Sequence, residues 1–199
     1  MSRLLIWRHG NTDWNGGERV QGQSDIPLNE RGRAEAAAAA ARLAALRPDA
    51  IVSSDLVRAA ETAAALARVT GLRVRSDARL RERFYGDWQG HTIDEIRVRW
   101  PKEYADWRAG VGAPGCGIES LDDMGKRVGE ALFDAVDAAP GGTVVVVTHG
   151  GAARQACGAL LGWPGATLRA LGGLDNCHWT DLRHDPVRGW QMRAHNAGA

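Results

Sequence analysis

The sequence predicts an α/β fold, a three-layer α/β/α sandwich whose sheet is mostly parallel and has one antiparallel edge. Short apolar runs of strand length alternate along the chain with longer segments of high helix propensity, a pattern typical of parallel strands joined by helices. The last part of the chain instead carries two alternating runs around a turn signal, which indicates a terminal hairpin. Together these observations favour helices on both faces of the sheet and an antiparallel pair at its edge.

Three strands and two helices are expected in the first half of the chain. The apolar runs that predict the strands are residues 4–7, 50–53 and 72–74. The alanine-rich segments that predict the helices are residues 29–46 and 56–70. Pro48 ends the first helix, Ser54 and Asp55 are the expected N-cap of the second, and Gly71 closes it.

The second half is expected to add shorter helices, one long helix, a buried strand and the hairpin. The expected elements are helices from 92 towards 100 and on to 107, a helix over 120–138, a strand ending at 148, a helix over 151–161, and hairpin strands within 176–182 and 190–194. Thr92 can cap the first of these helices, and Pro101 interrupts it. Ser120 begins a capping-box pattern, and Asp185 with Pro186 marks the hairpin turn.

The length and composition predict one domain over residues 1–199. A chain of 199 residues with 44% hydrophobic residues can bury one core, and is short for two. The segment at about 91–119 is expected to form a partial lid. Its rings, Trp100, Tyr104 and Trp107, suit the mouth of a pocket, but they would equally pack the segment onto the body.

Charge and targeting signals narrow the range of partners and compartments. A net charge of +1, from 25 basic and 24 acidic residues, argues against binding to nucleic acid or to a membrane surface. The sequence shows no signal-peptide pattern and no apolar run of the length that spans a bilayer, so we expect a cytoplasmic protein. Cys116, Cys157 and Cys177 lack the spacing of a disulfide framework or a zinc site, and we expect them to be reduced.

Two strands end in the same dipeptide. His9 and Gly10 follow the first strand, directly after Arg8, and His149 and Gly150 follow the strand that ends at residue 148. Ligands of open α/β sheets bind at the carboxyl ends of strands, so two imidazoles and a guanidinium would meet there. This combination predicts an anion site, and phosphate is the anion we expect.

Other polar residues have two interpretations each. Thr12 and Asn15 could donate hydrogen bonds to the same anion as His9. Arg58 lies in the first turn of a helix, where anions bind well, although a surface salt bridge would also explain it. Glu82 lies between Arg81 and Arg83, and by composition alone it is a paired surface acid.

Four motifs in order resemble those of a known family, the histidine phosphatase superfamily, also called phosphoglycerate-mutase-like. They are Arg8-His9-Gly10-x-Thr12-x-x-Asn15, Ser53-Ser54-Asp55-x-x-Arg58-Ala59-x-x-Thr62, Leu80-x-Glu82-x-x-x-Gly86-x-Trp88-x-Gly90 and Thr148-His149-Gly150-Gly151. The resemblance covers nearly the whole chain. It implies the phosphoglycerate-mutase-like form of the predicted α/β/α fold.

The resemblance also implies a role for each site residue. His9 would be the nucleophile that becomes a phosphohistidine, and Glu82 the general acid. Arg8, Arg58 and His149 would bind the phosphoryl oxygens, and Asn15 would help to orient the phosphate. Two guanidiniums and a cationic imidazole would stabilise the transferring group electrostatically, so neither a metal nor another cofactor is expected.

The same phosphohistidine could serve a phosphatase or a 2,3-bisphosphoglycerate-dependent phosphoglycerate mutase. The lid segment is short and lacks an adjacent pair of arginines to hold a bisphosphate, which favours hydrolysis of a small phosphate ester of the phosphoglycerate or sugar-phosphate type. Runs at 20–25, 86–90 and 170–176 are most similar to glucosyl-3-phosphoglycerate phosphatases, and also to broad-specificity acid phosphatases. Gln21, Gly22, Gln23 and Gly150 are expected to contact substrate, although the glutamines could instead bond within their loop.

Two further classes of function stay open on the residues alone. His9, His149 and Glu82 have the composition of a zinc or iron site, but the neighbouring arginines would repel a cation. A non-catalytic phospho-ligand-binding protein is the other class, and the presence of both His9 and Glu82 argues against it. The sequence leaves the oligomeric state open, a homodimer included.

Overall fold

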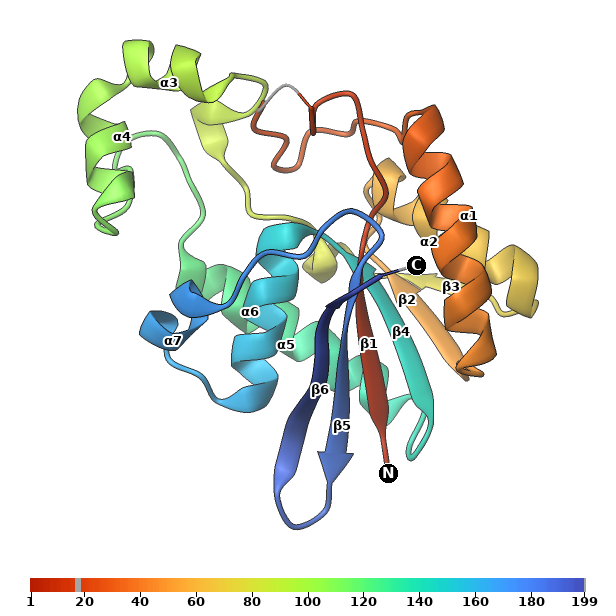
Figure 1. Cartoon of the computed structure of the whole chain (residues 1–199). Coiled ribbons are helices and arrows are strands. Elements are labelled where there is room, and N and C mark those ends of the chain that lie inside the picture. The colour runs from red at the N-terminus through yellow and green to blue at the C-terminus, as the bar shows by residue number, and fades with distance from the viewer. Residues whose placement is uncertain (17–18, 199) are drawn as a thin grey trace.

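A computed structural model of the chain describes residues 1–16 and 19–198 (Figure 1). The domain expected over residues 1–199 therefore includes positions 17, 18 and 199, which lie outside the described residues. The described part contains a six-stranded sheet of order β3-β2-β4-β1-β5-β6. Its strands are β1 (Arg3–Arg8), β2 (Ala50–Ser53), β3 (Val74–Ser76), β4 (Thr143–Thr148), β5 (Trp179–Asp185) and β6 (Gly189–Ala197).

The sheet is parallel through its first four positions and antiparallel at one edge, as the sequence predicts. β3, β2, β4 and β1 pair in parallel, whereas β5 runs antiparallel to β1 and β6 antiparallel to β5. In the central pair, Arg8 of β1 is in register with Thr148 of β4. The residues that follow these two strands, His9 and His149, therefore leave the sheet side by side.

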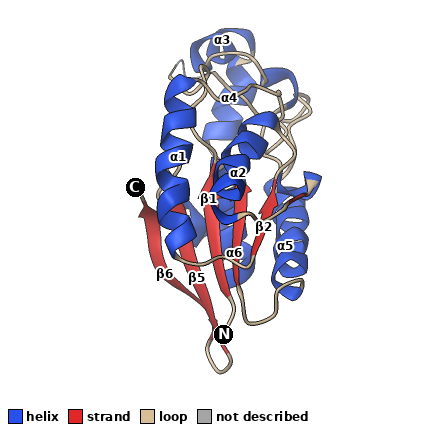
Figure 2. Ribbon diagram, turned by 90° about the vertical axis from the view of Figure 1, so that its right-hand side faces the viewer, coloured by secondary structure: helices blue, strands red, loops and turns tan. Residues whose placement is uncertain are grey.

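Helices cover both faces of this sheet (Figure 2). They are α1 (Glu30–Ala45), α2 (Val57–Thr70), α3 (Ile93–Arg99), α4 (Pro101–Arg108), α5 (Leu121–Asp137), α6 (Gly150–Leu161) and α7 (Gly165–Ala170). Side chains of the central strands alternate between the faces. Leu5 and Trp7 join the core formed with α1 and α2, whereas Leu4 and Ile6 join the core formed with α5 and α6.

The N-terminus of α2 differs from the sequence prediction. Its N-cap is Leu56, and no side chain of that residue caps the helix. Instead, Val57 donates its backbone N–H to Asp25 Oδ1 over 2.7 Å. Ser54 and Asp55, the expected cap, do not cap the helix, and this prediction was wrong. Ser54 Oγ accepts the N–H of Leu56, before the helix begins, and contacts a histidine of the site described below, whereas Asp55 pairs with Arg81.

Most other predicted boundaries agree closely with the structure. Asn29 caps α1, Gly71 closes α2 in the left-handed conformation, and Thr92 forms the capping box of α3. Asp185 accepts two backbone hydrogen bonds in the hairpin turn. β3 starts at Val74, two residues later than expected, and the short helix α7 had no prediction.

The segment from 91 to 119 lies beyond the carboxyl ends of the central strands, where Figures 1 and 2 both place α3 and α4. It packs around a small apolar core of its own that includes the buried Trp88 and Ile96. No helix in the described part of the chain has the length and apolar surface that crossing a bilayer requires.

Candidate active site

His9 and His149 lie together at the carboxyl edge of the central strands. Both side chains are buried, and their ring centroids are 5.1 Å apart. The Nδ1 atom of His9 is 2.7 Å from the carbonyl oxygen of Gly10. A carbonyl can only accept, so Nδ1 carries the proton and Nε2 keeps its lone pair. His9 thus presents a nucleophilic nitrogen.

His149 is held by the residue that was expected to cap α2. Its Nε2 atom is 2.9 Å from Ser54 Oγ, and both groups are buried. Ser54 in turn is fixed where β2 ends, because its backbone N–H donates to the carbonyl of Val147 in β4. The Nδ1 atom of His149 is buried and has no hydrogen-bond partner among the described residues.

Two guanidiniums converge on the histidines. Arg8 donates to the carbonyl of Leu174, and Arg58 donates to the carbonyls of Ser24 and Gly22 over 2.8 and 2.6 Å. The Nε atoms of Arg8 and Arg58 are buried without a partner within the described chain. Burial lowers the pKa of Arg8, and it lowers that of Arg58 to about 10. Both side chains stay positive at neutral pH, so the site holds two cations.

Burial and these two cations together favour the neutral form of both histidines. Burial, followed by Arg58 and Arg8, lowers the pKa of His9 well below its usual 6.5. Burial and the same arginines likewise lower the pKa of His149. The protein's own groups therefore favour two neutral imidazoles, and the cationic His149 expected from the sequence depends on a phosphate dianion beside it.

Glu82 reaches the site from a loop that has no regular secondary structure of its own. Its carboxylate accepts backbone hydrogen bonds from Arg83, Gly151 and Ala152 over 2.9, 2.9 and 3.0 Å. Two of these donors belong to the first turn of α6, where N–H groups point out of the helix and bind anionic groups. The N-terminus of α6 therefore fixes Glu82, one turn from His149.

A cavity of about 240 Å³ opens over these groups. From the sequence prediction it gathers Arg8, His9, Gln21, Gly22, Arg58, Glu82 and Gly150. Apolar and aromatic side chains also line it, among them Val20, Trp88, Ile93 and Trp107. The site therefore combines polar groups suited to a phosphoryl group with apolar surface for the rest of a ligand.

His149 lies behind His9 and does not itself line this cavity, and neither do Asn15 and Gln23. Asn15 Oδ1 accepts hydrogen bonds from the backbone and the hydroxyl of Thr12 over 2.9 and 3.1 Å. Gln23 donates its side-chain amide to the carbonyl of Glu82 over 3.1 Å. Both side chains hold loops of the site together, whereas Gln21 faces the cavity with a buried Oε1 that has no partner within residues 1–16 and 19–198.

The structure adds lining residues that the sequence reasoning missed, namely Arg19, Tyr85 and Ile93. Arg19 carried no signal, because 23 of the 25 basic residues in this chain are arginine. Of the lid rings, Trp107 lines the cavity, whereas Tyr104 stacks on Trp107. Both interpretations of the lid aromatics thus hold, each for a different ring.

The described residues contain no group of three or more His, Cys, Asp or Glu side chains arranged to hold a metal ion. The sequence offered His9, His149 and Glu82 as a zinc or iron site. Of these three, the Glu82 carboxylate instead accepts hydrogen bonds from backbone N–H groups of α6. Burial, and after it the neighbouring guanidiniums, lower the pKa of both His9 and His149. The arrangement suits an anion that carries more than one negative charge.

Comparison with known proteins gives consistent matches. The family model of the histidine phosphatase superfamily (branch 1) matches residues 4–198. A glucosyl-3-phosphoglycerate phosphatase of Mycobacterium tuberculosis is 42% identical over 99% of this chain and 95% of its own. A probable phosphoglycerate mutase GpmB of Photorhabdus laumondii is 34% identical over 96% of this chain and 90% of the mutase. The solved structure of a mycobacterial glucosyl-3-phosphoglycerate phosphatase with VO3 superimposes with a TM-score of 0.90, at 43% identity over 98% and 99% of the two chains.

Proposed function

The chain belongs to the histidine phosphatase superfamily (branch 1), and on this premise we propose that it is a phosphomonoesterase that forms a phosphohistidine on His9. The observation that carries the proposal is the His9 ring, whose Nδ1 proton is engaged by Gly10 while Nε2 stays free to attack. Its lowered pKa keeps this nitrogen unprotonated at neutral pH. A group at a cavity whose pKa is strongly shifted by burial and by specific neighbouring charges is a candidate for a catalytic role.

The first chemical step transfers the phosphoryl group. His9 Nε2 attacks phosphorus in line, an N–P bond forms, and the P–O bond to the leaving alkoxide breaks. Glu82, in the role of general acid, gives a proton to that alkoxide. Arg8, Arg58 and His149 bind the equatorial oxygens, where negative charge is spread in the transition state.

The second step returns the enzyme to its starting state. Water attacks the phosphohistidine, Glu82 takes a proton from that water, and the N–P bond breaks to release inorganic phosphate. The carboxylate can serve both the leaving alkoxide and the attacking water, because backbone N–H groups of α6 hold it beside the site. No step requires a group that the chain itself does not supply.

We further propose that the substrate is glucosyl-3-phosphoglycerate or a related phosphoglycerate ester. The relative at 42% identity and the structure with a TM-score of 0.90 are both phosphatases of that ester. In this chain the unpartnered Gln21 Oε1 can accept a hydrogen bond from a substrate hydroxyl. Tyr85, Trp88 and Trp107 also line the cavity, and aromatic surface of this kind suits the apolar face of a sugar ring.

A phosphoglycerate mutase is the second candidate, because one relative is described as a probable mutase. The basic residues of the lid argue against it in this chain. Arg97 and Lys102 form ion pairs within their own helices, and neither they nor Arg99 and Arg108 line the cavity. A second phosphate would thus find no cationic partner on the lid in the described structure.

The direct test is phosphate release from a panel of esters in the presence of EDTA. The panel contains glucosyl-3-phosphoglycerate, 3-phosphoglycerate, phosphoserine and an aryl phosphate, with mutase activity measured in parallel. Preferred hydrolysis of glucosyl-3-phosphoglycerate supports the proposal. Isomerisation without net release would establish a mutase instead, and absence of turnover on every ester would favour a phospho-ligand-binding protein.

A further inference from the structure

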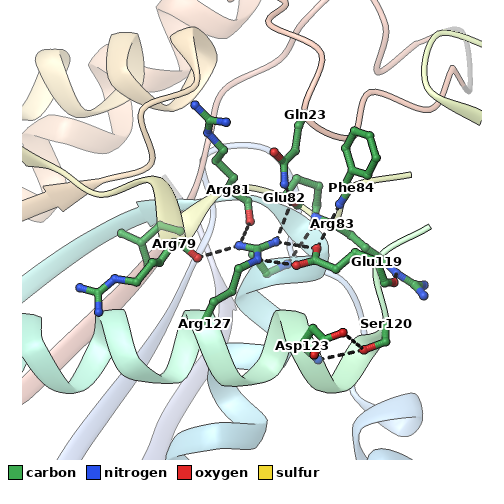
Figure 3. A network of polar contacts seen from close by, with 12 residues as sticks. Gln23, Arg79, Arg81, Glu82, Arg83, Phe84, Glu119, Ser120, Asp123 and Arg127 are labelled. Atoms are coloured by element: carbon green, nitrogen blue, oxygen red, sulfur yellow. Dashed lines mark hydrogen bonds and ion pairs between the residues drawn. The ribbon is translucent and has the colours of Figure 1, made fainter. Parts of the chain in front are cut away.

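Arg127 of α5 lies outside the cavity and outside every motif, yet it contacts the loop that carries the proposed acid. Figure 3 shows its side chain extending from α5 towards this loop, beside Glu119. Its Nη1 atom donates to the carbonyls of Arg79 and Arg81, both over 2.7 Å, and its Nη2 atom to the carbonyl of Glu82 over 2.9 Å. Three carbonyls within four residues thus share one guanidinium.

Glu119 completes the arrangement. Its carboxylate accepts from Arg127 Nε over 2.6 Å and from Nη2 over 2.8 Å. With the three carbonyls, these contacts use all five N–H donors of the guanidinium. Glu119 is itself tied to the same loop, because its carboxylate accepts the backbone N–H of Phe84 over 3.1 Å. The ion pair and the loop therefore form one connected network.

Other hydrogen bonds of this loop's backbone lie mostly at Phe84, whose carbonyl accepts the Glu119 N–H over 2.9 Å, and at Glu82, whose carbonyl also accepts from Gln23. A single 3₁₀ turn, Ala78–Leu80, precedes Glu82, and regular structure resumes only at Gly86. The remaining carbonyl in this run, that of Leu80, accepts the hydroxyl of Thr148, the residue before His149. Without Arg127, the carbonyls of Arg79 and Arg81 would lose this hydrogen-bond donor, and that of Glu82 would keep only Gln23.

The position of this network explains why it matters for chemistry. Arg127 fixes the main chain of Glu82, and the N-terminus of α6 fixes its carboxylate. Proton transfer needs the acid within hydrogen-bond reach of the leaving oxygen, and a displacement of about 1 Å can cost about 100-fold in rate. A loop free to shift would move the carboxylate relative to His9.

We infer that Arg127 is a positioning residue for proton transfer by Glu82, acting through the backbone of the acid-bearing loop. The inference rests on the proposed role of Glu82 as general acid. It distinguishes Arg127 from Arg8 and Arg58, because those two would bind the phosphoryl group itself. Loss of Arg127 should therefore impair protonation of the leaving group and spare phosphoryl binding.

The test compares esters with poor and good leaving groups. Arg127→Met is expected to lower kcat for 3-phosphoglycerate about 10- to 100-fold, because the acid is displaced. The same variant should keep kcat for an aryl phosphate within about threefold, because a phenolate needs little protonation. KM for either ester should change little. Arg127→Lys, which keeps the charge and up to three donors, should show a smaller split.

A matched control comes from another arginine of the same burial. The side chain of Arg3 is 19% exposed, as is that of Arg127, and it also forms a two-bond pair with a carboxylate, Asp181. Arg3 lies at the start of β1, at the end of the sheet away from the site. Arg3→Met should therefore leave the ratio of the two activities unchanged.

Glu82→Gln separates failure of this inference from failure of the proposed function. If Glu82→Gln slows both esters equally, the acid role is wrong, and the inference falls with it. If Glu82→Gln shows the split and neither Arg127 variant does, the inference alone is overturned. Support requires, in addition, that the double variant Arg127→Met, Glu82→Gln is no slower than Glu82→Gln on 3-phosphoglycerate. If Arg127 acts only through the acid, its loss has no further effect once the acid is gone. Arg127→Lys keeps the test decisive if Arg127→Met does not fold.

Discussion

Glu82 and Gly151 are in contact so close that a Cβ atom at the second position would force the carboxylate to shift. The Gly151 N–H donates to the carboxylate over 2.9 Å, and a Cβ atom on Gly151 would lie 2.5 Å from Glu82 Oε1. Real Cβ atoms do not approach oxygen this closely. The first turn of α6 thus accommodates the acid because it lacks a side chain there.

Gly151→Ala is accordingly expected to displace Glu82. We predict a fall of about 100-fold in kcat for 3-phosphoglycerate, because the acid leaves its reach. The aryl phosphate should be affected much less. Gly165→Ala is the control, since a Cβ atom there meets nothing within 4 Å. Steady-state kinetics on both esters check this, and an unaltered rate in Gly151→Ala would contradict the proposed position of the acid.

Gln21 and Gln23 should respond differently to substitution, although they lie two residues apart. Gln21→Met removes an acceptor that faces the cavity, and we expect KM for glucosyl-3-phosphoglycerate to rise about tenfold, with little change for an aryl phosphate. Gln23→Met removes a donor to the carbonyl of Glu82, and should lower kcat for poor leaving groups. Michaelis parameters for both esters measure the difference, which would be absent if the two side chains had one role.

The buried histidines predict how stability depends on pH. The folded-state pKa values of His9 and His149 lie below the 6.5 of an unfolded chain, chiefly through burial. The unfolded state therefore binds more protons below pH 6.5, and stability falls as the pH decreases from about 6.5. The loss is up to about 1.4 kcal/mol per histidine for each pH unit.

Thermal melting between pH 7.5 and 5 tests this dependence. The double variant His9→Asn, His149→Asn should show a flatter curve than the wild type, whereas His184→Asn in the terminal hairpin should not. Added phosphate should raise the melting temperature, because it binds only the folded site. Parallel curves for the wild type and the double variant would show that other groups determine how the melting temperature depends on pH below about 6.5.

The sequence predicts the elements whose signals are local. The valine run of β4 predicts a strand that is buried on both faces, and the alanine-rich segment of α1 predicts a helix. Both signals lie within a few consecutive residues, so the sequence alone reveals them. The two His-Gly pairs predict the site for a similar reason. Parallel strands end at one edge, so residues that follow β1 and β4 must meet.

Contacts between distant segments were beyond such reasoning. Ser54 is a residue type that often caps helices, but its hydroxyl contacts His149, 95 residues away, and the N–H of Leu56 before the helix begins. Gln23 and Asn15 lie in the expected loops, yet the direction of their side chains depends on Glu82 and Thr12. Arg127 has no sequence signal, because its partners are backbone carbonyls, which every residue has.

The central claim is that His9 becomes a phosphohistidine during turnover, and rapid-quench labelling tests it most directly. Wild-type protein mixed with a ³²P-labelled ester should yield a transient protein-bound label that is stable in base and labile in acid. His9→Ala should fold, bind vanadate, and show neither label nor turnover. Normal turnover or an equal label in His9→Ala would contradict the account.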